Sequence, residues 1–361
     1  MNLQSLLSSF SADNPRLFQL ADRVTMSQPQ HVYCKNLRGS APSFLISSVF
    51  QHQMFDGLNH LIICDDAESA AYVHNTVENL TRALDLFYFP SSFRNRKNFS
   101  LLNSSHIMLR TEALTKLTAG GNKKILVTYP EALFEKVVLP KTLSGNIIYL
   151  KNTDVIDLDE MVQKLIGYGF ERSDFVYEPG QFAIRGGIFD IYSFGNEKPY
   201  RIELFGNEID SIRIFDPETQ LSERKLVQVS IIPNVETQFG GDDKISLLDF
   251  LPENTVIWLQ EWELTRDRLL TQEEDFQMFL ENGAPVASEE NLQDKISLTQ
   301  DDFIGAAQLQ KQLQLRHTIE FGHRSTWNNS IEIEFNTKEQ PAFNRKFDFL
   351  IRDLKEWEKK G

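Results

Sequence analysis

The chain has 361 residues, of which 41% are hydrophobic and 24% are charged, and its formal net charge is −14. This composition is ordinary for a globular protein with two or three cores, and no apolar run reaches the length of about 18 residues that a membrane-spanning helix needs. The negative charge argues against a protein whose main task is to grip a phosphate backbone, although local basic patches remain possible, so a protein partner is the default expectation.

The N-terminal sequence MNLQSLLSSFSADNPRLFQL is amphipathic and lacks the basic and apolar regions of a signal peptide. The two cysteines, Cys34 and Cys64, lie in apolar surroundings without metal-ligand spacing. Buried, reduced thiols in a cytoplasmic protein are therefore expected.

Up to about residue 144 the pattern predicts strands that alternate with helices. Residues 1–30 are predicted to be helical with a break at Pro15, and HLIICDD predicts a strand from His60 whose aspartates cap the next helix. A second helix is predicted to begin at Asn103 or Ser104 and to stop at the glycines that follow it, and residues 123–138 repeat the strand–helix unit. Such alternation predicts a parallel sheet covered on both faces.

From residue 145 to about 234 the pattern changes to one helix, DLDEMVQKLIGYGF, followed by a meander of strands. Residues 180–216 read as three strands and two turns, with Gly186 and Gly187 as a bulge after Arg185. The length is that of a small α+β domain.

The strand–helix pattern resumes after the link IIPNVETQFGGDDK, with ENTVIWLQEWE and HTIEFGH as strands. The predicted organisation is therefore an α/β domain formed by 1–144 and 235–335, an inserted domain over 145–234, and a linker or the start of a following unit over 336–361. The amphipathic tail FNRKFDFLIRDLKEWEKKG stops where an α/β chain would continue, and this predicts that the chain was cut from something larger.

No catalytic signature is found. The nearest approach to a phosphate-binding loop is NLRGSAPSFLIS, where Gly39 and Ser40 are followed by Pro42 and Ser43. Proline supplies neither an amide donor nor a positive charge, so an ordinary strand-to-helix loop is favoured over a nucleotide site. The seven histidines show no metal-binding spacing, and His60 is interpreted as a strand-edge residue. No metal and no cofactor are expected, although a paired-carboxylate site needs geometry to exclude it.

The segment YRIELF places an arginine and a phenylalanine on the polar face of a predicted strand, which needs an explanation. In a strand, Tyr200, Ile202 and Leu204 share one face, which is an ordinary core face, and Arg201, Glu203 and Phe205 share the other. Arginine and exposed aromatic residues are typical anchors of protein interfaces. The alternative is that Phe205 packs under the next turn and Arg201 pairs across strands with an acidic neighbour.

The stretch EPGQFAIRGGIFDIYSFGNEKPYRIELFGNEIDSIRIFDPETQLS resembles the insert shared by UvrB and the bacterial transcription-repair coupling factor, Mfd. NLRGSAPSFLIS is similar to that factor's degenerate form of the UvrB nucleotide loop, with Pro42 in the lysine slot and Ser43 in the threonine slot. KKILVTYPEALFEKVVLP and ISLLDFLPENTVIWLQEWE also resemble the coupling factor, and no counterpart of UvrB's tyrosine-rich hairpin is found.

This resemblance implies a degenerate P-loop NTPase-like α/β domain and an inserted domain that docks UvrA. The family's UvrA contacts fall here on Arg185, Arg201 and Phe205. It further implies that UvrA is recruited to stalled RNA polymerase during nucleotide excision repair. The polymerase, double-stranded DNA and ATP are expected to engage domains outside this chain, among them a helicase-type translocase, so these residues are expected to have no enzymatic activity.

Two rival interpretations stay open. The chain could be a UvrB-type, ATP-dependent damage-recognition enzyme, which the missing lysine and missing hairpin oppose. It could instead be a module that binds DNA directly, which the net charge opposes.

Overall fold

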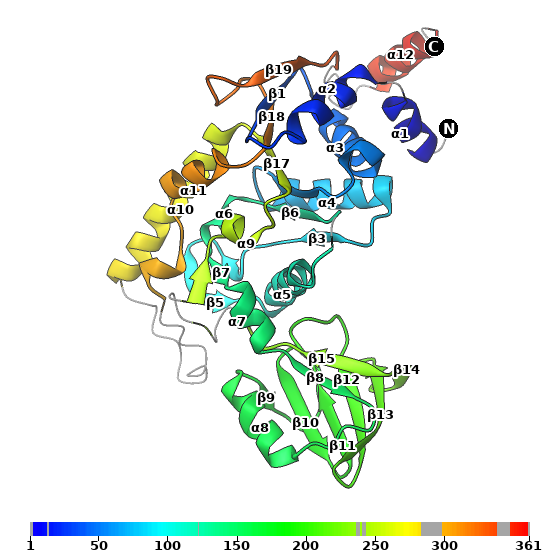
Figure 1. The fold of residues 1–361 in the computed structure, drawn as a ribbon, viewed down its shortest axis with the longest axis vertical. Helices are drawn as coiled ribbons and strands as arrows, with labels where there is room; N and C mark the ends of the chain where they lie inside the picture. Colours follow the sequence, from blue (N-terminus) through cyan, green and yellow to red (C-terminus); the bar gives the residue numbers. More distant parts are fainter. Residues whose placement is uncertain are drawn as a thin grey trace.

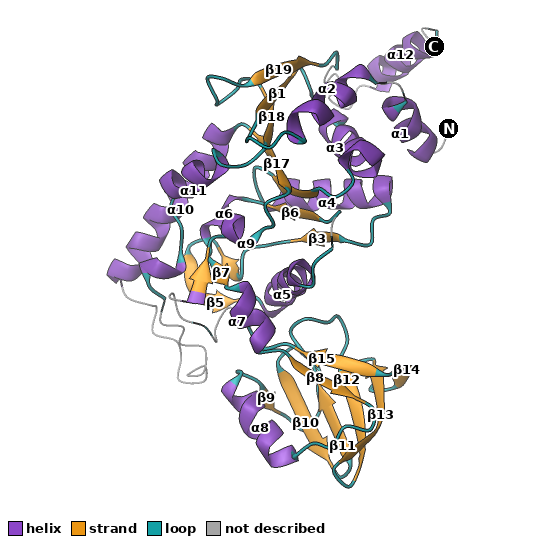
Figure 2. Ribbon diagram, in the orientation of Figure 1, coloured by secondary structure: helices purple, strands orange, loops and turns teal. Residues whose placement is uncertain are grey.

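The computed structural model describes residues 3–12, 14–121, 123–235, 239, 243–282, 298–337 and 347–359. The chain forms an α/β part and a strand-rich part, and both chain ends lie on the side of the α/β part that is remote from the strand-rich part (Figures 1 and 2). The strand-rich part is formed by the middle of the chain. The predicted α/β class with a separate β-rich region is confirmed.

The α/β part is built on a seven-stranded sheet in which every strand is parallel to its neighbours. In spatial order the strands are β19 (Ile331–Glu334), β1 (His31–Lys35), β18 (Thr318–Gly322), β17 (Thr255–Gln260), β2 (Asn59–Ile63), β6 (Ile125–Thr128) and β3 (Leu86–Tyr88). All residues of β2 and β6 are buried, as expected for strands covered on both faces. Strands from before and after the insert thus share one sheet.

Helices cover this sheet, and their ends follow the sequence signals. Asp66 accepts a hydrogen bond from the Ser69 amide at 2.8 Å and caps α4, and Asn103 caps α5 in the same manner. The longer helices are α1 (Leu3–Ser11), α2 (Pro15–Val24), α3 (Ala41–Gln51), α4 (Ala67–Thr81), α5 (Ser104–Thr118), α10 (Trp262–Asn282), α11 (Ala306–Leu313) and α12 (Phe347–Glu358). None of the helices within the described residues is long and apolar enough to cross a membrane.

Short elements complete the α/β part. They are β4 (Phe93–Asn95), β5 (Asn98–Leu102), α6 (Pro130–Phe134), β7 (Val137–Val138), α7 (Pro140–Gly145), β16 (Lys244–Ile245) and α9 (Leu247–Phe250). The link predicted over 231–244 lies partly outside the described residues.

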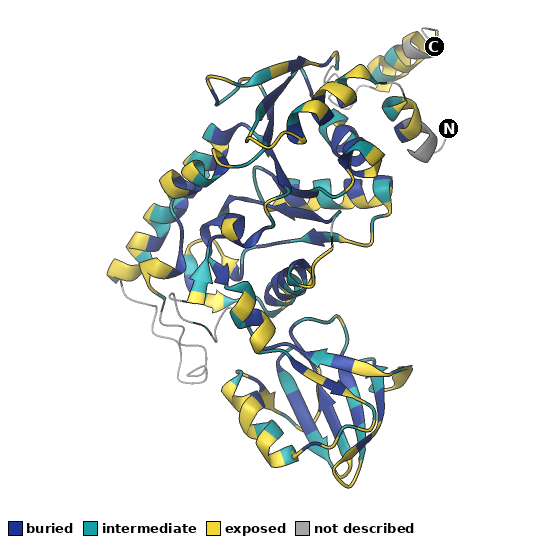
Figure 3. Cartoon of the chain, viewed as in Figure 1, coloured by how far each residue is buried: buried dark blue, intermediate teal, exposed yellow. Residues whose placement is uncertain are grey.

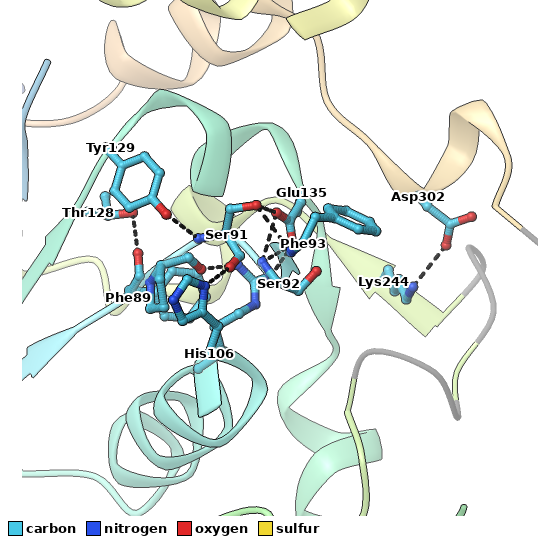
Figure 4. Close-up of polar contacts among 12 residues, drawn as sticks. Phe89, Ser91, Ser92, Phe93, His106, Thr128, Tyr129, Glu135, Lys244 and Asp302 are labelled. Atoms are coloured by element: carbon cyan, nitrogen blue, oxygen red, sulfur yellow. Dashed lines mark hydrogen bonds and ion pairs between the residues drawn. The ribbon is translucent and has the colours of Figure 1, made fainter. Parts of the chain in front are cut away.

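A buried carboxylate organises this region. Glu135 accepts hydrogen bonds from Ser91 Oγ at 2.6 Å and from the Ser92 amide at 3.0 Å, as Figure 4 shows. Arg110 of α5, itself fully buried, approaches the same carboxylate at 3.4 Å. These contacts satisfy a charge that would otherwise be costly to bury, and they fix α5 against the loop that follows β3.

The inserted domain joins the rest of the chain through paired strands. β8 (Ile148–Lys151) enters the domain, β15 (Gln228–Ile231) leaves it, and the two are antiparallel, with Ile148 opposite Ile231. Entry and exit therefore lie side by side, as a domain insertion requires. Ile107 of α5 packs into the core of the insert, so the helix also connects the two parts.

The core of the insert lies between α8 (Leu158–Gly167), β8, β15 and one face of a six-stranded sheet. The sheet order is β14 (Ser222–Leu226), β13 (Glu208–Phe215), β12 (Tyr200–Phe205), β11 (Ile188–Ile191), β10 (Gln181–Arg185) and β9 (Glu171–Arg172). In Figure 3, the inner strands β10 to β13 are mostly buried or half-buried, whereas exposed residues lie on the edge strand β14, at the hairpin ends and on α8.

Two details of the predicted meander were wrong. Residues 180–216 contain four strands, because QFAIR and IFDI are separate strands joined by a tight turn at Gly186–Gly187. Gly186 has a φ of +62°, and a Cβ on Gly187 would lie 2.9 Å from the Leu204 carbonyl oxygen, so the turn needs glycine at both positions. The bulge occurs between Glu203 and Leu204 instead.

His60 lies in β2, an interior strand, and the prediction of a strand-edge position was wrong. Its ring is buried, and its Nδ1 accepts a hydrogen bond from Trp258 Nε1 at 3.2 Å. Burial lowers the pKa of His60 to about 3. The imidazole is therefore neutral in the folded protein.

This burial predicts an acid-dependent loss of stability. Between pH 7 and pH 5 the unfolded chain protonates His60 and the folded chain does not, so the free energy of unfolding should fall by about 2 kcal/mol from this residue alone. Urea unfolding of wild type and of His60→Asn, which keeps an acceptor for Trp258, should show a shallower pH dependence in the variant. Equal slopes would contradict the assignment.

Candidate docking face of the inserted domain

The sheet face opposite the core of the insert carries two rows of polar residues. Asp190, Arg201, Arg213 and Lys225 are successive cross-strand partners. Arg185 and Glu203 belong to the neighbouring row, on either side of Ile188. The alternation predicted for YRIELF is therefore present, with Tyr200 and Ile202 in the core. The described ionic residues in these rows carry more positive than negative charge, unlike the chain as a whole.

Asp190 is the centre of these rows. Its side chain is 0% exposed, and its two carboxylate oxygens accept hydrogen bonds from Arg201 Nε and Nη2, each at 2.8 Å. Arg185 Nη2 donates to the same carboxylate at 2.6 Å. One buried charge thus holds two guanidinium groups that come from the strands on either side of it.

Aromatic rings support both arginines. The guanidinium of Arg185 lies 4.4 Å from the ring centroid of Phe175, and that of Arg201 lies 4.5 Å from the ring centroid of Phe215. Arg201 also donates to the Gln220 carbonyl at 3.0 Å. The hydrogen bonds to Asp190 raise the pKa of Arg201, so its charge is fixed.

Phe205 lies at the end of β12, opposite Glu208 and next to the turn at Gly206. Its side chain is 84% exposed, so it does not pack under the turn. A phenylalanine left in water at a hairpin tip is available for contact with a partner.

The three residues predicted to form a docking face therefore differ in their exposure to solvent. Phe205 points into solvent, whereas Arg201 has a side chain only 14% exposed and makes the cross-strand pair that was the alternative expectation. Arg185 is intermediate at 34%. Glu203 is half-buried and accepts a hydrogen bond from Ser211 Oγ at 2.6 Å.

Sequence reasoning missed Asp190 and Phe175. The alternation of side chains along the strands is the signal that could have identified Asp190. IFDI and YRIELF pair in a register that sets Asp190 opposite Arg201. Phe175 and its half-exposed neighbour Tyr177 precede β10 in a loop, and no periodic signal places them.

The predicted nucleotide-loop remnant has the position of a phosphate loop and different chemistry. Gly39, with φ of +63°, and Ser40 connect β1 to α3, and Pro42 occupies the first turn of that helix. A cavity of about 380 Å³ adjoins Pro42 and Ser43. Among the described residues that line this cavity, Glu68 is the charged one, and its carboxylate would repel a phosphate. Arg38 and His323 line a smaller cavity of about 100 Å³ that shares Gly39 and Pro42 with it. Within the described residues no cluster of His, Cys, Asp and Glu could hold a metal ion.

Comparison with known proteins defines the class of the strand-rich part. Residues 148–236 match the UvrB interaction domain family. This range contains β8, the six-stranded sheet and β15, so it includes the whole polar face described above. The insert therefore matches the UvrB interaction domain family over its whole strand-rich part.

The wider chain is similar to transcription-repair-coupling factors. That of Bacillus subtilis is 35% identical over 142 residues, which is 39% of this chain and 12% of the relative. That of Staphylococcus haemolyticus is 31% identical over 235 residues, which is 63% of this chain and 19% of the relative. That of Staphylococcus aureus strain Mu50 is 31% identical over 194 residues, which is 54% of this chain and 16% of the relative. These matches confirm the resemblance to an N-terminal region of the coupling factor family, and the matched part spans less than a fifth of each relative named here.

The Asp190 contacts predict different stabilities for two variants. Arg201→Ala leaves a buried carboxylate with one partner, and we expect it to reduce the free energy of unfolding by about 3 kcal/mol. Phe205→Ala should change it by less than about 0.5 kcal/mol, because the ring is exposed. Urea unfolding measures both, with Arg224→Ala on the exposed strand β14 as the arginine control. Equal effects of the two arginine changes would contradict the role of Asp190.

Proposed function

We propose that this region is a non-catalytic docking module that binds UvrA and thereby recruits it to stalled RNA polymerase in transcription-coupled nucleotide excision repair. The observation that carries the proposal is the exposed Phe205 on the same sheet as the arginines that Asp190 orients, in a region that matches the UvrB interaction domain family. The proposed site of action is the cytoplasm.

The physical features of the face support protein recognition. Aromatic residues and arginine contribute most of the binding energy at many protein interfaces. An aromatic side chain that is exposed in the free protein can bury a large apolar area when a partner binds. Phe205 has the most exposed phenylalanine ring among the described residues, and Arg185 lies on a half-exposed Phe175. The positive excess in this face would also attract an acidic partner surface.

RNA polymerase and double-stranded DNA are proposed partners of other regions of the coupling factor, and the same holds for its ATP-driven translocase activity. The direct DNA-binding alternative is weaker, since the positive charges of the face are in part neutralised by Asp190 and Glu203. The UvrB-type alternative requires a working nucleotide site.

The docking proposal predicts specific losses of UvrA binding. Phe205→Ala and Arg185→Ala should each weaken binding by about 2 kcal/mol or more, which is typical of anchor residues. Calorimetry with UvrA from the same organism measures the dissociation constants, and circular dichroism checks the fold.

The matched control is Phe347→Ala, which removes a phenylalanine that is 71% exposed on α12, outside the insert. It should bind UvrA as the wild type does. Wild-type affinity in Phe205→Ala, or the same loss in Phe347→Ala, would contradict the proposed face.

The chain should not bind ATP with measurable affinity. Pro42 removes an amide donor from the first turn of α3, and the charged residue among the described residues that line the adjoining cavity of about 380 Å³ is Glu68, which would repel a triphosphate. Titration with a fluorescent ATP analogue in the presence of Mg²⁺ should give no saturable signal. Saturable binding that excess ATP competes away would favour the UvrB-type enzyme.

A further inference from the structure

The two arginines that contact Asp190 differ in how many of their donors are already used within the domain. Arg201 uses three donor positions, two on Asp190 and one on the Gln220 carbonyl, and its side chain is largely buried. Arg185 donates one hydrogen bond, from Nη2 to Asp190, among the described residues, and a third of its side chain is exposed. Arg201 is thus held within the sheet, and Arg185 keeps further donors for another group.

The surroundings of Arg185 restrict where those donors point. Its guanidinium is attached to Asp190 at one nitrogen and lies over the Phe175 ring at 4.4 Å. An arginine side chain in water loses about 2 kcal/mol of rotamer entropy when it is fixed. Because Arg185 is already held in the free protein, much of this entropy is lost before a partner binds. Less entropy is then lost on binding, which strengthens the complex.

Without the buried carboxylate the arrangement would not persist. Asp190 lies on β11 between the strands that carry Arg185 and Arg201, and both guanidinium groups contact one of its oxygens. Two guanidinium groups brought this close repel one another unless an anion lies between them. Loss of that anion would release Arg185 from its orientation.

We propose that Asp190 is a positioning residue for docking: it holds Arg201 in the sheet and Arg185 over Phe175, so that the remaining donors of Arg185 meet a carboxylate of the partner. The inference rests on the proposed UvrA-docking function. A guanidinium fork fixed in this way suits a carboxylate better than a lysine ammonium would, because it offers parallel donors.

The test is Asp190→Asn, which keeps the shape of the side chain and replaces the shared oxygen acceptors with one oxygen and one amide donor. Calorimetry with UvrA should show affinity reduced at least tenfold. The control is Asp210→Asn on β13, which changes the net charge equally at an exposed position of the same sheet, and it should stay within twofold of wild type.

A double-mutant cycle separates positioning from general damage to the fold. If Asp190 acts through Arg185, then Asp190→Asn added to Arg185→Ala should weaken binding less than twofold further, because the group to be positioned is already absent. The Arg185→Ala protein keeps the pairing of Asp190 with Arg201. An equal loss in both backgrounds would show a structural effect and overturn the inference.

The outcomes also distinguish this inference from the function on which it rests. Absence of binding by the wild type removes the proposed function, and the inference falls with it. Binding by the wild type together with unchanged binding by folded Asp190→Asn overturns the inference alone and leaves UvrA docking in place.

Discussion

The antiparallel pairing of β8 with β15 is the contact on which the architecture depends. It sets Ile148 opposite Ile231, so the chain leaves the α/β part and returns to it at neighbouring points. Because entry and exit are adjacent, β17 and β18 can complete a parallel sheet begun by β1 and β2 some two hundred residues earlier, at a modest loop-closure cost. The insert can then form its own core, with α5 of the α/β part as its support.

In our proposal, one face of the insert's sheet stabilises the fold and the other recognises the partner. One face of the six-stranded sheet is apolar and packs on α8, β8 and β15, so it supplies the hydrophobic contribution to folding. The other face carries Asp190 with its arginines, and burying such a cluster costs desolvation free energy that its hydrogen bonds must offset. Such a cluster fixes the orientation of its arginine side chains more than it stabilises the fold. Fixed side chains are what the proposed docking face needs. In the proposed docking function, Phe205, exposed at the hairpin tip, is the apolar anchor.

Much of the fold could be predicted because it follows from local signals. Continuous apolar runs such as HLII and TVIWLQ gave the buried strands, and Asp66 and Asn103 marked helix starts through their side-chain caps. The strand boundary at Gly186 was missed because two glycines fit a bulge and a tight turn equally well, and the choice depends on which strands pair. The interior position of His60 likewise depends on sheet order, which the sequence does not encode locally.

The candidate site shows the same limit. Alternation along YRIELF correctly separated the core face from the polar face, and Phe205 is exposed as that pattern indicated. The pattern could not reveal that Arg201 is nearly buried, because its burial depends on the carboxylate of Asp190 and the ring of Phe215, which come from two other strands. Arg185 and Phe175 are brought together by a loop whose path carries no periodic signal.

Hydrogen–deuterium exchange of the chain with and without UvrA tests the central claim most directly, because it needs no substitution. We expect the complex to slow amide exchange in residues 181–191 and 200–208, which form the hairpins that carry Arg185, Asp190 and Phe205, with α3 and the nucleotide-loop remnant unchanged. Protection confined to the α/β part, with these hairpins exchanging as in the free protein, would contradict the account.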